Sequence, residues 1–399
     1  MSGHDGTEGI RVIFAGGGTG GHIMPGAATA EALHALLPGA RCLFLATDRG
    51  SERQCRRALA GFEVLEMPAA RWEGLAQKAR FAATAPLALV RCVEVLRGFR
   101  PHVVVGLGGY SSVLPVLAAR ALGLRTMLFE SNAIPGRVVR ALAPLVDCVQ
   151  VQWSATGRCL RARRVTVTGN PIRDGVLRSD RAAARARLGL APARCTLLVM
   201  GGSQGALALN RLALGALRRM GERPDMLPQG GMQVLHLTGP AHLEEVLRSD
   251  APCGMVYRPV GFLHEMEDAY AAADFVVARA GGSSLAELTA AGLPAVLVPF
   301  PFAADDHQTA NAAVLAEAGA AVAIAQSRLT ADTLAALISD IARNAERRAK
   351  MAECSRSMGR PDAARAVAAE IAALANFKLD VAVTQNRASF TKPSLSKAA

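Results

Sequence analysis

Short apolar runs alternate with longer segments of mixed polarity along most of the chain. Each run is a few residues long and rich in Val, Ile and Leu, which is typical of a strand buried on both faces of a sheet. The intervening segments are long enough for helices, and strands that alternate with helices predict doubly wound parallel sheets. The predicted strands lie at residues 12–15, 42–46, 103–105, 126–129, 148–151, 197–200, 233–237, 255–257, 275–278 and 295–298.

Glycine-rich turns follow three of these runs, at residues 16–21, 106–112 and 201–205. Glycine lets backbone N–H groups approach a ligand closely, and a helix that starts at such a turn offers a site for an anion. After the first turn, Pro25 suits the first turn of a helix over residues 25–37. Three turns of this kind in one chain favour phosphate binding over simple strand-to-helix connections.

The first turn also fits a different ligand. Gly16, Gly18 and Gly21 satisfy the dinucleotide fingerprint, so a nicotinamide or flavin enzyme is an alternative. Such an enzyme needs an acidic residue at the end of the second strand to bind the ribose. Asp48 comes two residues past that strand, which is a poor fit.

The length of the chain and one break in the pattern predict its domains. A chain of 399 residues exceeds what a single core usually spans, so two domains are expected. The break is Gly169-Asn170-Pro171, between two similar series of strands. The predicted division is an N-terminal extension at 1–10, a Rossmann-like domain at 11–171, a second at 172–358, a C-terminal helix at 359–375 and a disordered tail at 376–399.

Basic charge is spread unevenly. Residues 1–171 hold 20 Lys and Arg against 11 Asp and Glu, a balance of +9, whereas the whole chain carries +12. The first half is therefore expected to face a phosphorylated substrate, an acidic membrane surface or nucleic acid. Nucleic acid fits least, because aromatic residues for base stacking make up only 4% of the chain. A basic surface that is simply solvated is the remaining alternative.

Basic and apolar residues are interleaved over residues 71–100. Such a segment suits the surface of an anionic bilayer, and the alternative is an ordinary helix that covers the sheet. Residues 81–90, the longest uncharged stretch in this part, are too few to span a bilayer, and the N-terminus has no apolar signal segment. Neither a transmembrane helix nor export is expected. The eight cysteines show no metal-binding spacing, so neither zinc nor a disulfide framework is predicted.

Eight short motifs follow one another through both predicted domains: GGGTGGHIMPG at 16–26, GLGGYSS at 106–112, ESNAIPG at 130–136, TGNPIR at 168–173, MGGSQGA at 200–206, ARAGGSSLAEL at 278–288, AAGLPAVLVPFP at 290–301 and DHQTANA at 306–312. In this order they resemble the MurG family, the inverting UDP-N-acetylglucosamine transferases that convert lipid I to lipid II in bacterial cell-wall synthesis. The resemblance covers residues 11–375. It implies an α/β GT-B fold, in which two Rossmann-like domains face an interdomain cleft and the C-terminal helix crosses back to the first domain, and no obligatory cofactor.

The same resemblance implies substrates and a location. The donor is UDP-N-acetylglucosamine, held by the second domain, and the acceptor is undecaprenyl-pyrophosphoryl-muramyl-pentapeptide. The enzyme is expected as a peripheral protein on the cytoplasmic face of the plasma (inner) membrane. Carried over position by position, the substrate-binding pattern falls on Thr19, Gly20, Gly21, Asn132, Arg173, Ser203, Leu263, Gly282, Ser283, Ser284, Leu285, Ala286, Glu287 and Gln308.

The residue types suit these roles. Ser203 and the glycine before it are expected to cradle a phosphate at a helix N-terminus, and Arg173 to pair with the pyrophosphate. Glu287, expected in the first turn of a helix, accepts hydrogen bonds from both ribose hydroxyls. Two positions depart from the family pattern: residues 129–132 are Phe-Glu-Ser-Asn instead of His-Glu-Gln-Asn, and His307 replaces a common Gln.

The implied reaction is a single displacement with inversion at the anomeric carbon, and it needs a base for the acceptor's 4-hydroxyl. His22, at the edge of the first glycine turn, is the candidate because imidazole titrates near neutral pH. The alternative is that His22 only orients the turn. Glu130 is the second candidate base. Asp305 and Asp306 are expected to start a helix, and no metal site is predicted.

Three other functions remain as alternatives. A nicotinamide-dependent oxidoreductase is disfavoured by the glycine motifs of the second domain and by the position of Asp48. A non-enzymatic basic module that binds membranes is disfavoured by phosphate motifs in both domains. Another UDP-sugar enzyme of the same fold, such as an epimerase or a glycolipid glycosyltransferase, is the nearest alternative.

Overall fold

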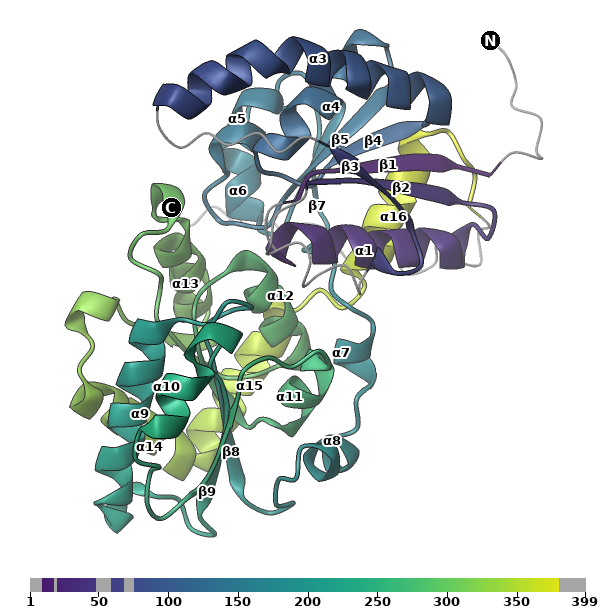
Figure 1. Cartoon of the computed structure of the whole chain (residues 1–399). Coiled ribbons are helices and arrows are strands. Elements are labelled where there is room, and N and C mark those ends of the chain that lie inside the picture. The colour runs from purple at the N-terminus through teal and green to yellow at the C-terminus, as the bar shows by residue number, and fades with distance from the viewer. Residues whose placement is uncertain (1–8, 18–19, 48–58, 68–74, 380–399) are drawn as a thin grey trace, which may run out of the picture.

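The computed structural model describes residues 9–17, 20–47, 59–67 and 75–379, and it contains two α/β domains (Figure 1). Each domain is built on one parallel sheet with helices on both faces. The strand order is β3-β2-β1-β4-β5-β6-β7 in the first domain and β10-β9-β8-β11-β12-β13 in the second. The predicted pair of doubly wound parallel sheets is therefore confirmed.

The first sheet consists of short strands that are connected mainly by helices. Its strands are β1 (Arg11–Ala15), β2 (Arg41–Thr47), β3 (Glu63–Met67), β4 (Val103–Gly106), β5 (Arg125–Glu130), β6 (Cys148–Val151) and β7 (Val165–Val167). Its helices are α1 (Gly20–Leu36), α3 (Leu75–Phe99), η2 (Tyr110–Ser112), α4 (Val113–Ala121), α5 (Arg137–Leu142) and α6 (Ser154–Arg158).

Alternate side chains of β1 serve two hydrophobic cores. Val12 and Phe14 belong to the core that α1 covers, while Ile13 and Ala15 belong to the core beneath α3 and α4. All four side chains are fully buried. Because both faces of the strand are covered, its sequence is a continuous apolar run, which is why the pattern predicted it.

Of the four edge strands, β10 was predicted, at residues 255–257, whereas β3, β7 and β13 were not. In β3 the side chains of Glu63, Val64 and Glu66 are exposed, and β7 is only partly buried. The short β13 at the edge of the second sheet is likewise only partly covered. A strand with one neighbour needs no long apolar run, so its sequence carries a weak signal.

The second domain repeats the plan. Its strands are β8 (Cys195–Met200), β9 (Met232–Leu237), β10 (Val256–Val260), β11 (Phe275–Ala278), β12 (Ala295–Leu297) and β13 (Ala321–Ala323). Its longer helices are α9 (Leu207–Gly221), α12 (Gly282–Ala291), α13 (His307–Glu317), α14 (Ala331–Arg343) and α15 (Ala345–Met358). The shorter ones are α7 (Gly175–Arg178), α8 (Arg181–Arg187), η3 (Pro224–Met226), η4 (Pro240–His242), α10 (Leu243–Arg248), α11 (Met266–Ala272), η5 (Ala304–Asp306) and η6 (Gln326–Arg328).

The last helix, α16 (Ala363–Leu374), leaves the second domain and packs beside α1 (Figure 1, yellow). Val367, Ala368 and Ile371 of α16 are fully buried in the same core as Val12 and Phe14 of β1. The chain therefore crosses between the domains twice, once before α7 and once before α16. This second crossing holds the two sheets in a defined relation.

The first helix starts earlier than predicted. We expected a helix over residues 25–37 with Pro25 in its first turn, but α1 begins at Gly20 and Pro25 lies inside it. Proline has no N–H to donate to the carbonyl four residues earlier, so a proline inside a helix leaves that carbonyl without its usual partner. In α1 this carbonyl belongs to Gly21, and its partner comes from the other domain.

Candidate active site between the domains

Each sheet has a topological switch point, where neighbouring strands lead the chain to opposite sides. In the first sheet it lies between β1 and β4, and in the second between β8 and β11. The three glycine-rich turns follow β1, β4 and β8, and Gly281-Gly282 of the ARAGGSSLAEL motif follows β11. In open parallel sheets, ligands bind beyond the carboxyl ends of the strands at such points. These glycine motifs therefore lie at the carboxyl ends of the strands in each sheet.

The carboxyl ends of the two sheets face each other, and Ser283 of α12 makes the first contact between the domains. Its Oγ donates a hydrogen bond of 2.8 Å to the carbonyl of Gly21, the carbonyl that Pro25 leaves unpaired within α1. Ser283 Oγ also accepts a hydrogen bond of 3.2 Å from Asn170 Nδ2. The first turn of α1 and the first turn of α12 are thus joined directly.

A second contact is made by Asn311 of α13, whose side chain is fully buried. Its Nδ2 donates to Asn132 Oδ1 at 3.0 Å and to the carbonyl of Ala280 at 2.9 Å. Its Oδ1 accepts a hydrogen bond of 2.7 Å from the backbone N–H of Ala133. Asn311 therefore ties the loop after β5 to the loop after β11. It was not among the predicted site residues, although it lies within the DHQTANA motif.

The turns of the first domain pack so tightly that only glycine fits. Gly16 has φ 129°, and a Cβ there would lie 2.9 Å from the carbonyl oxygen of Gly108. The N–H of Gly17 donates to Ser111 Oγ at 3.1 Å. The turns after β1 and β4 are thus packed against each other, and His22 borders them.

His22 is the third residue of α1, and its ring lies against the turn after β4. A Cβ on Gly108 would stand 3.3 Å from both Cδ2 and Nε2 of the imidazole. Burial lowers the pKa of His22, and the nearby charge of His307 lowers it further. The imidazole is therefore neutral at neutral pH, as a general base must be.

Glu130, the last residue of β5, holds the loop that follows it. The side chain is 5% exposed, and burial raises its pKa. Its Oε1 accepts hydrogen bonds from the backbone and side-chain N–H groups of Asn132, and Oε2 accepts one of 2.7 Å from Gly136 N. With both oxygens bound to N–H donors, Glu130 fits a loop-ordering role better than the second-base role expected from the sequence.

The carboxylate of Glu287 is held by two partners. Arg173 Nη2 lies 3.3 Å from Oε1, and the hydroxyl of Tyr270 donates to Oε2 at 2.7 Å. Burial opposes the charge of Arg173, but Glu287, Tyr270 and Glu267 together raise its pKa. Burial and the carboxylate of Glu287 both raise the pKa of Tyr270. Arg173 and Glu287, predicted as separate ligand contacts, are therefore direct neighbours.

The expected place of Glu287 in the first turn of its helix was wrong. The helix α12 begins at Gly282, so Glu287 is its sixth residue and lies in the second turn. The N-terminal turn itself has Gly281 as its cap, and among the described residues the cap forms no side-chain hydrogen bond. A Cβ on Gly282 would stand 2.5 Å from the carbonyl oxygen of Ser131, so a glycine is required at this contact between the domains.

The other predicted ligand-binding residues of α12 differ in how deeply they are buried. Ser283 and Ser284 are half-buried, whereas Leu285 and Ala286 are buried in the core of the second domain. A ligand contact at Leu285 or Ala286 is therefore limited to the backbone. Gln308 Oε1 accepts hydrogen bonds from the N–H groups of Ala280 and Phe300, at 3.2 and 3.0 Å, and so braces the loop before α12.

Ser203 lies on an exposed turn and not at a helix N-terminus, which corrects the expectation. The helix α9 begins at Leu207, four residues later. Gly202 has φ 91° and open space around it, so the backbone of this turn is accessible.

Three other predicted residues lie elsewhere. Leu263 is half-buried against the core of the second domain, just before α11. Thr19 lies outside the described residues, and Gly20 is the first residue of α1.

Asp305 makes the third contact between the domains. Its carboxylate pairs with Arg137 and Arg140 of α5, each at 2.8 Å. We expected Asp305 and Asp306 together to start a helix, and this holds for Asp306, which is the N-cap of α13 and accepts a hydrogen bond from Thr309. Asp305 instead links the second domain to the first across the cleft.

Within the described part of the chain, no three His, Cys, Asp or Glu side chains are grouped as metal ligands. None of its helices is long and apolar enough to cross a membrane.

Comparisons with known proteins agree with this architecture. Residues 12–151 match the glycosyltransferase family 28 N-terminal domain, and residues 196–367 match the glycosyltransferase family 28 C-terminal domain. A UDP-N-acetylglucosamine–N-acetylmuramyl-(pentapeptide) pyrophosphoryl-undecaprenol N-acetylglucosamine transferase from Anaeromyxobacter sp. (strain Fw109-5) is 40% identical over 361 residues, which are 90% of this chain and 92% of the relative. The protein of the same name from Syntrophus aciditrophicus (strain SB) is 39% identical over 328 residues, 82% of this chain and 88% of the relative.

Solved structures give the same result. The crystal structure of Acinetobacter baumannii MurG superposes with a TM-score of 0.70 at 28% identity and covers 91% of this chain and 99% of its own. The calicheamicin glycosyltransferase CalG4, at 16% identity and a TM-score of 0.60 over 92% of this chain and 99% of its own, shares the fold alone. The GT-B architecture and the glycosyltransferase class are confirmed. With matches over both domains and 40% identity over nine-tenths of its length, the chain belongs to the MurG family of glycosyltransferases.

Proposed function

We propose that the chain transfers N-acetylglucosamine from UDP-N-acetylglucosamine to the 4-hydroxyl of the muramyl sugar of lipid I, which gives lipid II. One observation carries this proposal. Three relatives that each align with nine-tenths of the chain all bear the name of this transferase. The hydrogen bonds that join the motifs of the two domains support it. Peptidoglycan synthesis is the process that the reaction serves.

The second domain holds the donor in this proposal. Glu287 accepts hydrogen bonds from the ribose hydroxyls, and the backbone of the turn at 201–205 and the uncapped N-terminus of α12 face the diphosphate. Helix N-termini and exposed N–H groups stabilise phosphate oxygens. Arg173, which lies beside Glu287, supplies a guanidinium to the same ligand, so that one donor molecule contacts both side chains while their ion pair persists.

The acceptor lies on the first domain, and His22 is the base. The acceptor's 4-hydroxyl oxygen attacks the anomeric carbon, the bond from that carbon to the diphosphate oxygen breaks, and UDP leaves. His22 takes the hydroxyl proton, for which a neutral imidazole is ready. The positive end of α12 and Arg173 stabilise the charge that develops on the diphosphate. Because attack and departure occur on opposite sides of the sugar, the configuration inverts.

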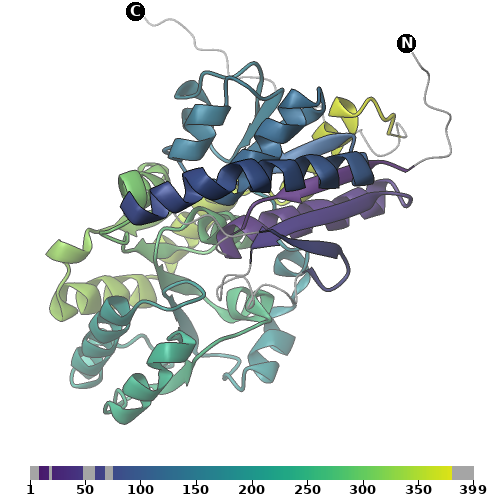
Figure 2. The ribbon, with the colours of Figure 1, turned by 45° about the horizontal axis from the view of Figure 1, so that its top comes forward.

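The helix α3 is the proposed membrane contact. Figure 2 shows it lying across the outer face of the first domain. Cys92 and Leu96 are buried against the sheet, whereas Leu87 and Val90 are 76% and 54% exposed. The helix therefore covers the sheet and also presents apolar side chains outward. Exposed apolar residues beside arginines suit an anionic bilayer, where the lipid acceptor lies.

One assay separates the transferase from the alternative functions. The purified chain is incubated with UDP-N-acetylglucosamine, with and without a lipid-pyrophosphate muramyl acceptor, and released UDP is measured. The transferase releases UDP only when the acceptor is present and forms a disaccharide-linked lipid. An epimerase changes the sugar without the acceptor, and an oxidoreductase responds to a nicotinamide cofactor. UDP release that does not depend on the acceptor contradicts the proposal.

The membrane contact is tested by flotation with vesicles that contain phosphatidylglycerol. The double variant Arg80→Glu with Arg91→Glu is expected to bind these vesicles more weakly. The reason is that each basic residue near an anionic surface contributes about 1 kcal/mol. The matched control reverses Arg158 and Arg161, which are exposed elsewhere in the first domain. Equal binding by both double variants leaves the arginines of α3 as a solvated surface.

A further inference from the structure

A second hollow lies in the second domain, away from the cleft. It has a volume of about 540 Å³ and is lined by the end of α12, by the segment before α8 and by one face of α15. Two of its lining residues, Asp274 and Pro294, directly precede β11 and β12. These are the amino-terminal ends of the strands, whereas the cleft lies beyond the carboxyl ends. The helix α12 begins at the cleft and ends at this hollow.

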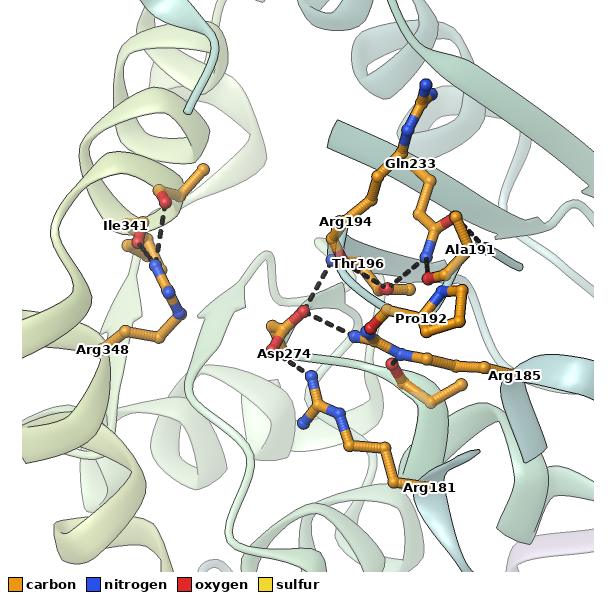
Figure 3. A network of polar contacts seen from close by, with 12 residues as sticks. Arg181, Arg185, Ala191, Pro192, Arg194, Thr196, Gln233, Asp274, Ile341 and Arg348 are labelled. Atoms are coloured by element: carbon orange, nitrogen blue, oxygen red, sulfur yellow. Dashed lines mark hydrogen bonds and ion pairs between the residues drawn. The ribbon is translucent and has the colours of Figure 1, made fainter. Parts of the chain in front are cut away.

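Most of the charged side chains that line the hollow are arginines. Arg181, Arg348 and Arg356 line the hollow, and Asp274 is the single acidic residue among the lining side chains. Asp274 is already shared: one oxygen pairs with Arg181, and the other pairs with Arg185 at 2.9 Å and accepts from the N–H of Thr196 at 2.7 Å. Figure 3 shows this arrangement. One carboxylate thus stands against four guanidinium groups.

The two arginines of α15 lack a carboxylate partner in the described structure. Arg348 Nη1 donates to the carbonyls of Ile341 and Ala342, at 2.8 Å each, in the last turn of α14, where the helix dipole offsets part of the guanidinium charge (Figure 3). Within the described residues, neither Arg348 nor Arg356 forms an ion pair with a carboxylate. They lie eight residues apart on the same helix face, about 12 Å along the axis at the rise of an α-helix. Small side chains lie between them, at Ala349 and Ala352.

The half-buried thiol of Cys195 lies near charges of both signs. Burial raises its pKa to about 11, the carboxylate of Asp274 also raises it, and the positive charges of Arg348, Arg185 and Arg181 act to lower it. Arginines from α8 and from α15 therefore act on one small region, although they are far apart in the sequence. An excess of positive charge in a hollow attracts an anion from solution.

We propose that this hollow binds a small molecule that carries two or more phosphate groups. Guanidinium groups bind phosphate oxygens in pairs, through planar and charge-assisted hydrogen bonds. The volume is that of a site for a metabolite-sized ligand. Arg348 and Arg356 contact the phosphate groups from α15, and Arg181 closes the opposite side. Several negative charges on one ligand match the excess of guanidinium groups better than a single carboxylate does.

Inorganic pyrophosphate is the probe. It is titrated into the full chain in a calorimeter with saturating UDP present. UDP occupies the donor site, so the heat that is measured comes from pyrophosphate bound elsewhere. Arg348→Ala with Arg356→Ala is expected to reduce the affinity tenfold or more. The matched control, Arg343→Ala with Lys350→Ala, removes the same charge from exposed positions that do not line the hollow and keeps the affinity of the wild type. No binding by the wild type, or equal affinities in the two double variants, overturns the proposal.

Folding and the source of the ligand need separate measurements. Arg348 donates to carbonyls at the end of α14, so its loss disturbs the contact between α14 and α15, whereas no side-chain hydrogen bond or ion pair of Arg356 is present among the described residues. The single variant Arg356→Glu is therefore expected to keep the unfolding midpoint of the wild type and to lose affinity for pyrophosphate. If this variant keeps its affinity for pyrophosphate, the proposed site is contradicted. Flotation with phosphatidylglycerol vesicles distinguishes the sources: weaker flotation of Arg356→Glu assigns a lipid headgroup, and unchanged flotation assigns a soluble phosphate compound.

Discussion

Replacing Glu287 by Gln removes one charge and changes little else. The side chain keeps its length and an oxygen that accepts from the hydroxyl of Tyr270, which is 2.7 Å from the carboxylate in the wild type. Alanine would leave this buried hydroxyl without a partner, at a cost of about 1–3 kcal/mol in stability. The glutamine variant therefore reports on ligand binding with the least disturbance of folding.

The size of the effect follows from the two ribose hydroxyls that Glu287 is proposed to bind. A hydrogen bond to a charged group contributes about 1.5–3 kcal/mol and a neutral one about 0.5–1.5 kcal/mol. Two bonds that lose their charge assistance therefore weaken UDP binding by about 2–3 kcal/mol. This difference is on the order of 30- to 150-fold in affinity. The lost ion pair with Arg173 is missing from the free and bound variant alike, so it largely cancels.

Calorimetric titration with UDP and with 2′,3′-dideoxy-UDP tests this reasoning. Glu287→Gln is expected to weaken UDP binding by the stated factor and to leave binding of the dideoxy compound almost unchanged. The matched control is Glu267→Gln, because Glu267 lies 3.9 Å from the same Arg173 but on α11. Equal weakening for both ligands, or the same loss in Glu267→Gln, refutes ribose recognition by Glu287.

The remaining predictions concern the base, a buried histidine and metal ions. His22→Ala is expected to lower turnover by about 10²–10⁴-fold with UDP affinity almost intact, and loss of donor binding at normal turnover would instead make His22 a loop-orienting residue. Because burial lowers the pKa of His22, turnover is expected to persist below pH 6.5 in a pH-rate profile, and an acidic limb above that pH contradicts the assignment. Burial lowers the pKa of His236 to about 4. The unfolded chain therefore binds the proton first, and urea titrations are expected to show stability falling between pH 6.5 and pH 4, by about 3 kcal/mol in total. His236→Gln removes this part of the pH dependence, and an unchanged dependence contradicts it. Transfer is expected without divalent metal, and complete loss of activity in chelator, restored by magnesium or manganese, would show otherwise.

The central strands and the glycine turns were predicted because each leaves a mark in consecutive residues, an apolar run for a strand and a group of glycines for a turn. Residues such as Val12 and Phe14 form an apolar run since both faces of β1 are covered, and that requirement is written in consecutive positions. Gly16 is required by one close approach between neighbouring turns. The edge strand β3 has no such requirement, so the polar residues in it concealed the strand.

The sequence by itself determined two parallel sheets, the glycine turns at their carboxyl ends and, through eight ordered motifs, the family of the chain. The tertiary structure decided which side chains meet. Ser283 reaches the carbonyl of Gly21, and Asn311 reaches Asn132, across 262 and 179 positions of the sequence. The physical reason is that such contacts depend on how two separately folded sheets are oriented, which is set by the return of α16 to α1. No local pattern of residues encodes that orientation.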